Sequence, residues 1–207
     1  MTSGPTRRRR VEAIVAAVVF AVGLLSGCPA WSGDPDADWS VQQLMRDLSL
    51  VSSSKARFVE RKYLKVLKAP LQFSGTLTYT APGRLEKRTL TPKPETLTLD
   101  GDQLTIENKA RNERRTLRLQ DYPVLWAFVE SIRSTLSGDL KALERFYRVE
   151  LEGSPKQWRL YLVPREPQLS AVISLIRIDG GRDRVDLIEV QEAQGDRSVM
   201  KVYEEAR

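Results

Sequence analysis

The sequence predicts an α+β protein of mostly antiparallel β structure, with about 10 to 11 strands in a meander that curls towards a barrel and about three helices that cover its apolar face. Apolar and polar residues alternate through much of residues 56–120 and again through the last third of the chain, as in strands with one apolar face. Asp100-Gly101 lies between two such runs, which is a strong hairpin signal. Apolar residues at three- and four-residue intervals in residues 123–146 predict two amphipathic helices between the strand-rich parts.

The first 27 residues predict a lipoprotein signal peptide. Arg7 to Arg10 precede an apolar stretch from Ala13 to Leu25, which is shorter than the roughly 20 residues that a bilayer-spanning helix needs. Leu25-Ser26-Gly27-Cys28 resembles the bacterial lipobox, in which the cysteine thiol is lipidated and the chain is cut before it. We therefore expect Cys28 to anchor the mature protein to a membrane. The alternative is an ordinary signal peptide with an incidental Cys28.

Residues 28–38 are rich in Pro, Gly, Ser, Asp and Ala and predict a flexible tether, which leaves residues 39–207 as the folded domain. Apolar residues at helical spacing predict a helix over Trp39–Leu50, and mixed alternation predicts a first strand over Ala56–Leu64. The basic residues of this strand leave two interpretations open. In the first, they keep a solvated edge strand from pairing with the edge of another sheet; in the second, they bind an acidic or phosphorylated headgroup. The four residues are Arg57, Arg61, Lys62 and Lys65.

Turn and capping signals predict the remaining elements. Residues 109–115 are polar and basic, which predicts a loop after the first group of strands. Pro123 opens a helix that Gly138 ends, and Asp139 caps a second helix over residues 140–146. Further alternation predicts the closing strands, at residues 147–151, 158–164, 172–178, 185–191 and 198–203.

The composition excludes several classes of function. The chain of 207 residues is 41% hydrophobic and 29% charged, as is usual for a globular protein. It has no histidine and one cysteine, which excludes a Ser-His-Asp or Cys-His pair, a zinc site of the usual ligand sets and an intramolecular disulfide, so no cofactor or metal is expected. Removal of the arginine-rich signal peptide lowers the net charge from +6 to about +3, and nothing points to nucleic acid as a partner.

The order of the predicted elements and several short segments carry a family resemblance. The segments are Ala56-Arg57-Phe58, Gly75-Thr76-Leu77-Thr78-Tyr79, Pro82-Gly83-Arg84-Leu85, Leu99-Asp100-Gly101-Asp102-Gln103-Leu104, the strand at residues 158–164 and Gly195-Asp196. Over residues 39–205 they resemble the LolA/LolB family of bacterial lipoprotein carriers. The resemblance implies an incomplete antiparallel barrel with helices as a lid, enclosing an apolar cavity that accepts acyl chains.

The apolar faces of the predicted strands and helices, together with this resemblance, predict the lining of the ligand cavity. Apolar pockets with few polar groups suit lipid tails. The expected cavity residues are Phe73, Leu77, Tyr79, Leu85, Leu97, Leu99, Leu104, Ile106, Phe128, Ile132, Trp158 and Leu160.

Two positions depart from the pattern of the soluble carriers. An arginine of those carriers, which helps to hold the lid shut, is replaced by Ala81 here, and an aromatic residue nearby is replaced by Leu85. The lid is therefore expected to open more readily or to be held by packing alone. Residues 122–147 are more similar to a divergent branch of LolA-related proteins, some of them encoded beside lipid or aryl-polyene pigment genes in Gram-negative bacteria.

The sequence and the resemblance together predict an exported, periplasm-facing lipoprotein, at the outer rather than the inner membrane. It binds acylated or otherwise apolar molecules, lipoprotein or lipid, and transfers them without catalysis. Expected partners are these acyl chains, the membrane through Cys28, and proteins of envelope transport or of lipid and pigment biosynthesis. The alternatives are a structural or interaction lipoprotein with no cavity and, with less support, an enzyme of envelope lipids that uses a carboxylate such as Asp102, Glu107 or Glu130.

Overall fold

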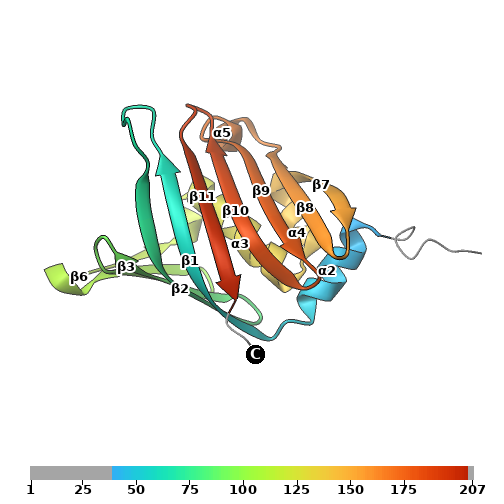
Figure 1. Cartoon of the computed structure of the whole chain (residues 1–207), viewed down its shortest axis with the longest axis horizontal. Helices are drawn as coiled ribbons and strands as arrows, with labels where there is room; N and C mark the ends of the chain where they lie inside the picture. Colours follow the sequence, from blue (N-terminus) through green and yellow to red (C-terminus); the bar gives the residue numbers. More distant parts are fainter. Residues whose placement is uncertain (1–38, 205–207) are drawn as a thin grey trace, which may run out of the picture. The chain divides into compact units, whose positions relative to one another are not determined.

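The computed structural model describes residues 39–204, which fold into one eleven-stranded antiparallel sheet covered on one face by helices (Figure 1). The spatial order of the strands is β6-β5-β4-β3-β2-β1-β11-β10-β9-β8-β7. Strands β6 and β7 are the two free edges, so the sheet curls without closing. The predicted fold class, an unclosed antiparallel barrel with a helical lid, is confirmed.

The elements have the following bounds. The helices are α2 (Val41–Ser49), α3 (Pro123–Ser137), α4 (Leu140–Phe146) and α5 (Pro167–Ser170), with short 3-10 turns η2 (Lys109–Arg111) and η3 (Leu119–Asp121). The strands are β1 (Ser53–Tyr63), β2 (Leu71–Thr80), β3 (Arg84–Thr91), β4 (Glu95–Asp100), β5 (Gln103–Asn108), β6 (Glu113–Arg118), β7 (Tyr147–Ser154), β8 (Gln157–Pro164), β9 (Ile173–Gly181), β10 (Arg184–Glu192) and β11 (Arg197–Glu204).

The first and last strands pair in the middle of the sheet. Phe58 of β1 lies opposite Gly75 of β2 on one side and opposite Val202 of β11 on the other. The interpretation of β1 as a charged edge strand is therefore wrong, because β11 covers the edge that β1 would otherwise expose. The outer face of β1 still carries exposed Arg57 and Arg61, whereas Lys62 lies on the inner face.

The predicted helix ends are confirmed by their caps. Pro123 is the first residue of α3, and Gly138 ends it with φ of 69°, in the left-handed region that glycine tolerates best. The Asp139 carboxylate accepts a hydrogen bond of 2.9 Å from the backbone N–H of Ala142 at the start of α4. In α2 the Ser40 hydroxyl accepts from the backbone N–H of Gln43 in the same way.

Two short elements differ from the prediction. Only residues 109–111 of the expected loop form a turn, since β6 already begins at Glu113. Strand β6 is an edge strand with almost every residue exposed. Its first residues, 113–115, are all charged and lack the apolar alternation that predicts a strand from Thr116 onward. The four-residue helix α5 was not expected, because so short a segment has no helical period to detect.

The hydrophobic core lies between the β7–β10 half of the sheet and helices α2, α3 and α4. Leu44 of α2 and Leu143 of α4 are both fully buried there, against strand residues such as Ile176. Burial raises the pKa of Tyr147 to about 12, and its hydroxyl donates a 3.2 Å hydrogen bond to the Ala127 carbonyl in α3. None of the helices in residues 39–204 is long and apolar enough to cross a bilayer.

Candidate functional site: an apolar cavity under helix α3

The inner face of the sheet is packed over β7–β9 and hollow over β1–β4 and β11, and β10 contributes to both parts. A cavity of about 980 Å³ lies between α3 and the inner face of the sheet, and most of its lining is apolar. The contributing strands are β1, β2, β3, β4, β10 and β11, together with the first residue of β9. The volume is near the upper end of the range of about 300–1,000 Å³ for ligand pockets.

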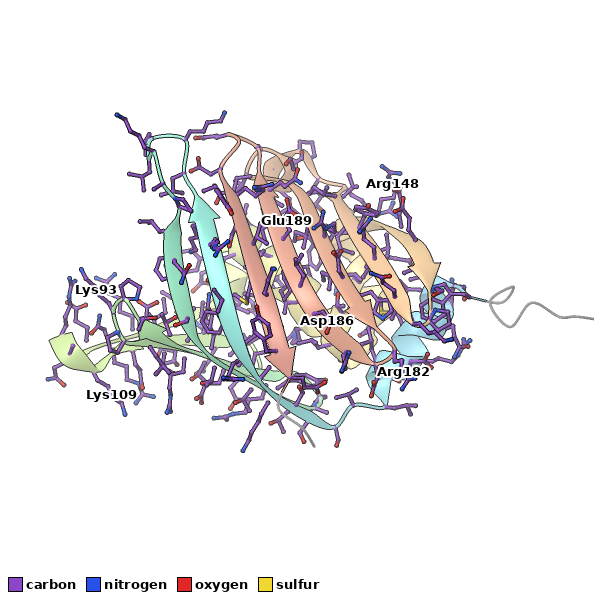
Figure 2. All side chains as sticks on the ribbon, viewed as in Figure 1. Lys93, Lys109, Arg148, Arg182, Asp186 and Glu189 are labelled. Carbon is purple, nitrogen blue, oxygen red and sulfur yellow. The ribbon has the colours of Figure 1, made fainter. Side chains whose placement is uncertain are left out.

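Strand alternation decides which residues face the cavity. Successive side chains of a strand point to opposite faces, so Met200 and Val202 of β11 line the cavity while Val199 does not. The same rule places Ile188 of β10 inside, and Figure 2 shows its neighbour Glu189 on the outer face. Ion pairs cover that outer face; one joins Glu189 to Arg177 of β9, with N···O of 3.0 Å.

The structure brings six of the expected cavity residues to the cavity. They come from four elements: β2, β3, β4 and α3. These residues are Leu77, Tyr79, Leu85, Leu97, Phe128 and Ile132. Whether they contact a ligand stays a prediction.

The other expected cavity residues lie outside the lining. Trp158 and Leu160 are 1% and 0% exposed, because the helices pack directly on β8 and leave no space above them. Leu99 is buried at the end of β4, and β5 carries the half-buried Leu104 and Ile106 beyond the cavity wall. Phe73 lies beside the cavity, where its ring meets the Lys62 ammonium at 5.4 Å. Cys28 lies outside the described residues.

Sequence analysis missed the β10–β11 wall of the cavity. Ile188, Val190, Met200 and Val202 line it, and their spacing of two is visible in the sequence. What the sequence did not reveal is the pairing of β11 with β1, which places these residues opposite the expected cavity residues of β2 and β3.

A buried carboxylate lies within this apolar lining. The Glu60 side chain is 6% exposed and accepts 2.5 Å and 2.7 Å hydrogen bonds from Lys87 Nζ and Ser198 Oγ, while Lys62 Nζ lies 3.7 Å away. Burial pushes the pKa of Glu60 up, but the nearby lysines and the serine hydroxyl outweigh it, so the pKa lies below its usual value. Glu60 is therefore ionised at neutral pH and holds together β1, β3 and β11.

A second polar contact ties α3 to the rim of the sheet. Arg133 Nη1 donates a 2.9 Å hydrogen bond to the carbonyl of Gly101, in the β4–β5 turn, and its Nη2 pairs with Glu130 on the same helix. The aliphatic part of Arg133 also lies against Gly83 in the β2–β3 turn, where a Cβ would come within 2.7 Å of it. The alternative that packing alone holds the lid is thus wrong, because Arg133 of the helix adds a polar contact to the β4–β5 turn. The other alternative, that the lid opens more readily, stays a prediction.

No ligand set for a metal is present in residues 39–204, where no three His, Cys, Asp or Glu side chains are grouped. The site is a hollow, apolar sheet face with one ion cluster in its wall and a helix across it. This geometry defines a class of protein in which an unclosed antiparallel sheet forms an apolar cavity beneath a helix.

The family assignment agrees with this class. A family model described as "Outer membrane lipoprotein carrier protein LolA-like" matches residues 30–203. The chain therefore belongs to the LolA-like family of outer membrane lipoprotein carrier proteins. No curated protein matches it in sequence.

Solved structures with a similar fold have low sequence identity to this chain. One is a LolA superfamily protein from Nitrosomonas europaea (9% identity, TM-score 0.44, 79% of this chain and 91% of that chain). A putative outer membrane lipoprotein-sorting protein domain from Vibrio parahaemolyticus is also similar (10% identity, TM-score 0.41, 78% of this chain and 88% of that chain). So is the MucA/MucB complex of Pseudomonas aeruginosa (12% identity, TM-score 0.46, 78% of this chain and 55% of that chain).

Proposed function

We propose that this protein is a non-catalytic carrier or acceptor of the cell envelope, which binds acylated or other apolar molecules in its cavity and passes them on. The observation that carries the proposal is the cavity of about 980 Å³ with its mostly apolar lining under α3. Removing apolar chains from water is favourable in proportion to the area buried, and a preformed cavity offers that area without unfolding the core. Membership in the LolA-like carrier family supports lipoprotein or lipid as cargo.

The alternative of a structural lipoprotein without a ligand has less support. A well-packed sheet protein leaves few voids larger than a water molecule, because each void loses packing contacts. A hollow of this size within an otherwise packed domain is consistent with a ligand-binding role. Catalysis also has less support, since the buried Glu60 already pairs with Lys87 and Ser198.

Binding of a fluorescent fatty acid or lipopeptide to the full chain carrying Cys28→Ser tests the proposal. We expect saturable binding and a rise in Tm, because a ligand at 100 times its Kd stabilises the folded state by about 2.7 kcal/mol. Calorimetry and fluorescence measure the two effects. A linear, non-saturable signal with an unchanged Tm would instead favour the structural lipoprotein.

We further propose that Cys28 carries a lipid anchor at the periplasmic side of the outer membrane. Several acyl chains hold a protein on a bilayer firmly, at about 0.8 kcal/mol for each buried methylene. Cys28→Ser is therefore expected to abolish incorporation of labelled palmitate and to leave a larger chain, because the signal peptide is cut only before a lipidated cysteine. Palmitate labelling and gel mobility measure this. Equal labelling of the variant, or an unchanged size, would contradict the anchor.

A further inference from the structure

The ion cluster around Glu60 gives the cavity a chemical preference that its size and apolar lining do not. Glu60, Lys62, Lys87 and Ser198 all belong to the cavity lining, so the cluster is part of the surface that cargo contacts. We infer that the cavity selects amphiphiles with an anionic oxygen head, carboxylate or phosphate, which Lys62 and Lys87 bind while the apolar chain lies along the rest of the lining. This inference rests on the proposed function.

The charges of the cluster do not cancel. One carboxylate faces two ammonium groups, Lys87 Nζ at 2.5 Å and Lys62 Nζ at 3.7 Å, which leaves one positive charge in excess. Lys62 and Lys87 keep 44% and 24% of their side chains exposed, although Glu60 itself is buried. A lysine ammonium has three N–H donors, so both groups retain donors for a second anion after pairing with Glu60.

Aromatic rings hold both ammonium groups in place. Lys87 Nζ lies 5.0 Å from the centre of the Phe58 ring, and Lys62 Nζ lies 5.4 Å from that of Phe73. Such rings attract a cation by their quadrupole but leave its hydrogen-bonding capacity to other partners. The two lysines are thus fixed on the cavity wall by contacts that a bound anion does not have to break.

Most of the other charged side chains in the lining pair with residues outside the cluster at Glu60. Arg197 pairs with Glu189 of the outer face, Glu86 with Arg88 of the same strand, and Asp121 with Arg118. Glu192 is exposed at the end of β10. Arg184 and Glu204 lie 4.0 Å apart at the opposite end of the cavity strands. Among these side chains, the cluster at Glu60 is where the cavity wall holds surplus positive charge within apolar surroundings.

Four ligands with the same twelve-carbon chain test the inference on the full chain carrying Cys28→Ser. They are dodecanoate, dodecyl phosphate, dodecanol and dodecyltrimethylammonium, each competing with a fluorescent apolar probe below its micelle concentration. We expect at least one of the two anions to bind about tenfold or more tightly than dodecanol, as a charge-assisted hydrogen bond allows, and the cation to bind most weakly. Comparing the affinities of dodecanoate and dodecyl phosphate shows whether the cavity prefers a carboxylate or a phosphate head.

Variants of the cluster give opposite expected shifts. Lys62→Met should reduce the preference for the anion over dodecanol to about twofold or less, whereas Glu60→Gln should increase it, because a competing carboxylate is removed. Lys55→Met, which removes the same charge from the exposed outer face of β1, should leave the preference unchanged. Lys62 is the more exposed of the two lysines and the more distant from Glu60, at 3.7 Å, so its loss leaves the 2.5 Å Glu60–Lys87 pair in place.

Equal affinity for the anions and dodecanol would overturn the inference while leaving the proposed carrier function intact. A preference that survives in Lys62→Met, or that falls equally in Lys55→Met, would also overturn it and assign the cluster a purely structural role between β1, β3 and β11. Failure of every ligand to bind would contradict the proposed function itself.

Discussion

Arg133→Met is expected to speed the exchange of bound cargo by about tenfold or more. The change keeps the length of the side chain against Gly83 but removes the charged donor to the Gly101 carbonyl, a contact of 2.9 Å between α3 and the β4–β5 turn. Hydrogen bonds from charged groups are worth about 1.5–3 kcal/mol. The free energy needed to move α3 away from the sheet should fall by this amount. Stopped-flow displacement of a fluorescent fatty acid measures the exchange rate.

The control for this variant is a charge-matched change away from α3. Arg148 lies on edge strand β7 (Figure 2), and it pairs with the exposed Glu150 on the same strand. Arg148→Met removes the same charge and should leave the exchange rate unchanged. If Arg133→Met exchanges cargo at the parental rate with an unchanged circular dichroism spectrum, α3 does not act as the gate of the cavity.

Glu60→Gln is expected to lower the free energy of unfolding by about 3 kcal/mol at neutral pH. Breaking a buried ion pair typically costs about 3–5 kcal/mol, because the remaining charge has no partner, and the partial exposure of Lys87 places the expected cost at the lower end. Urea denaturation of the parent and the variant measures the difference. In the double variant Glu60→Gln/Lys87→Met the loss should be smaller than the sum of the two single losses, since no charge of that pair then remains.

The cost of Glu60→Gln should also depend on pH. The folded-state pKa of Glu60 is lowered, so its contribution to stability is fully present above the unfolded-state pKa, at about 4.3, and is lost as the pH falls through the lower folded-state value. The difference in unfolding free energy between parent and variant is therefore constant near neutral pH. It narrows only as the pH falls below about 4.3. A gap that widens on acidification would show that Glu60 is not stabilised as the carboxylate.

Strand alternation predicted the two faces of the sheet but not which part of the inner face is hollow. Leu77 and Leu97 line the cavity, whereas Trp158 and Leu160 lie under the helices, yet all four stand in similar alternating runs. An apolar face must be covered in either case, and the sequence pattern is the same whether protein or a ligand covers it. Only the packing of the helices on the β7–β9 part of the sheet distinguishes the two.

The cluster at Glu60 could not be predicted for a different reason. Its hydrogen bond to Ser198 joins residues 138 positions apart. No local sequence pattern predicts that the first and last strands are neighbours in the sheet. Lys87 has no feature in the sequence that separates it from the outward-facing lysines. The lid contact of Arg133 escaped prediction because a side chain that binds a turn carbonyl leaves no periodic pattern.

The central claim is that apolar cargo occupies the cavity, and a matched pair of tryptophan variants tests it most directly. Met200 faces the cavity and Val199 faces outward on the same strand, so Met200→Trp fills the space whereas Val199→Trp adds the same bulk outside it. Equilibrium binding of a fluorescent fatty acid to the two folded variants is the measurement. We predict at least about tenfold weaker binding for Met200→Trp and parental affinity for Val199→Trp. Parental affinity in folded Met200→Trp would contradict the claim.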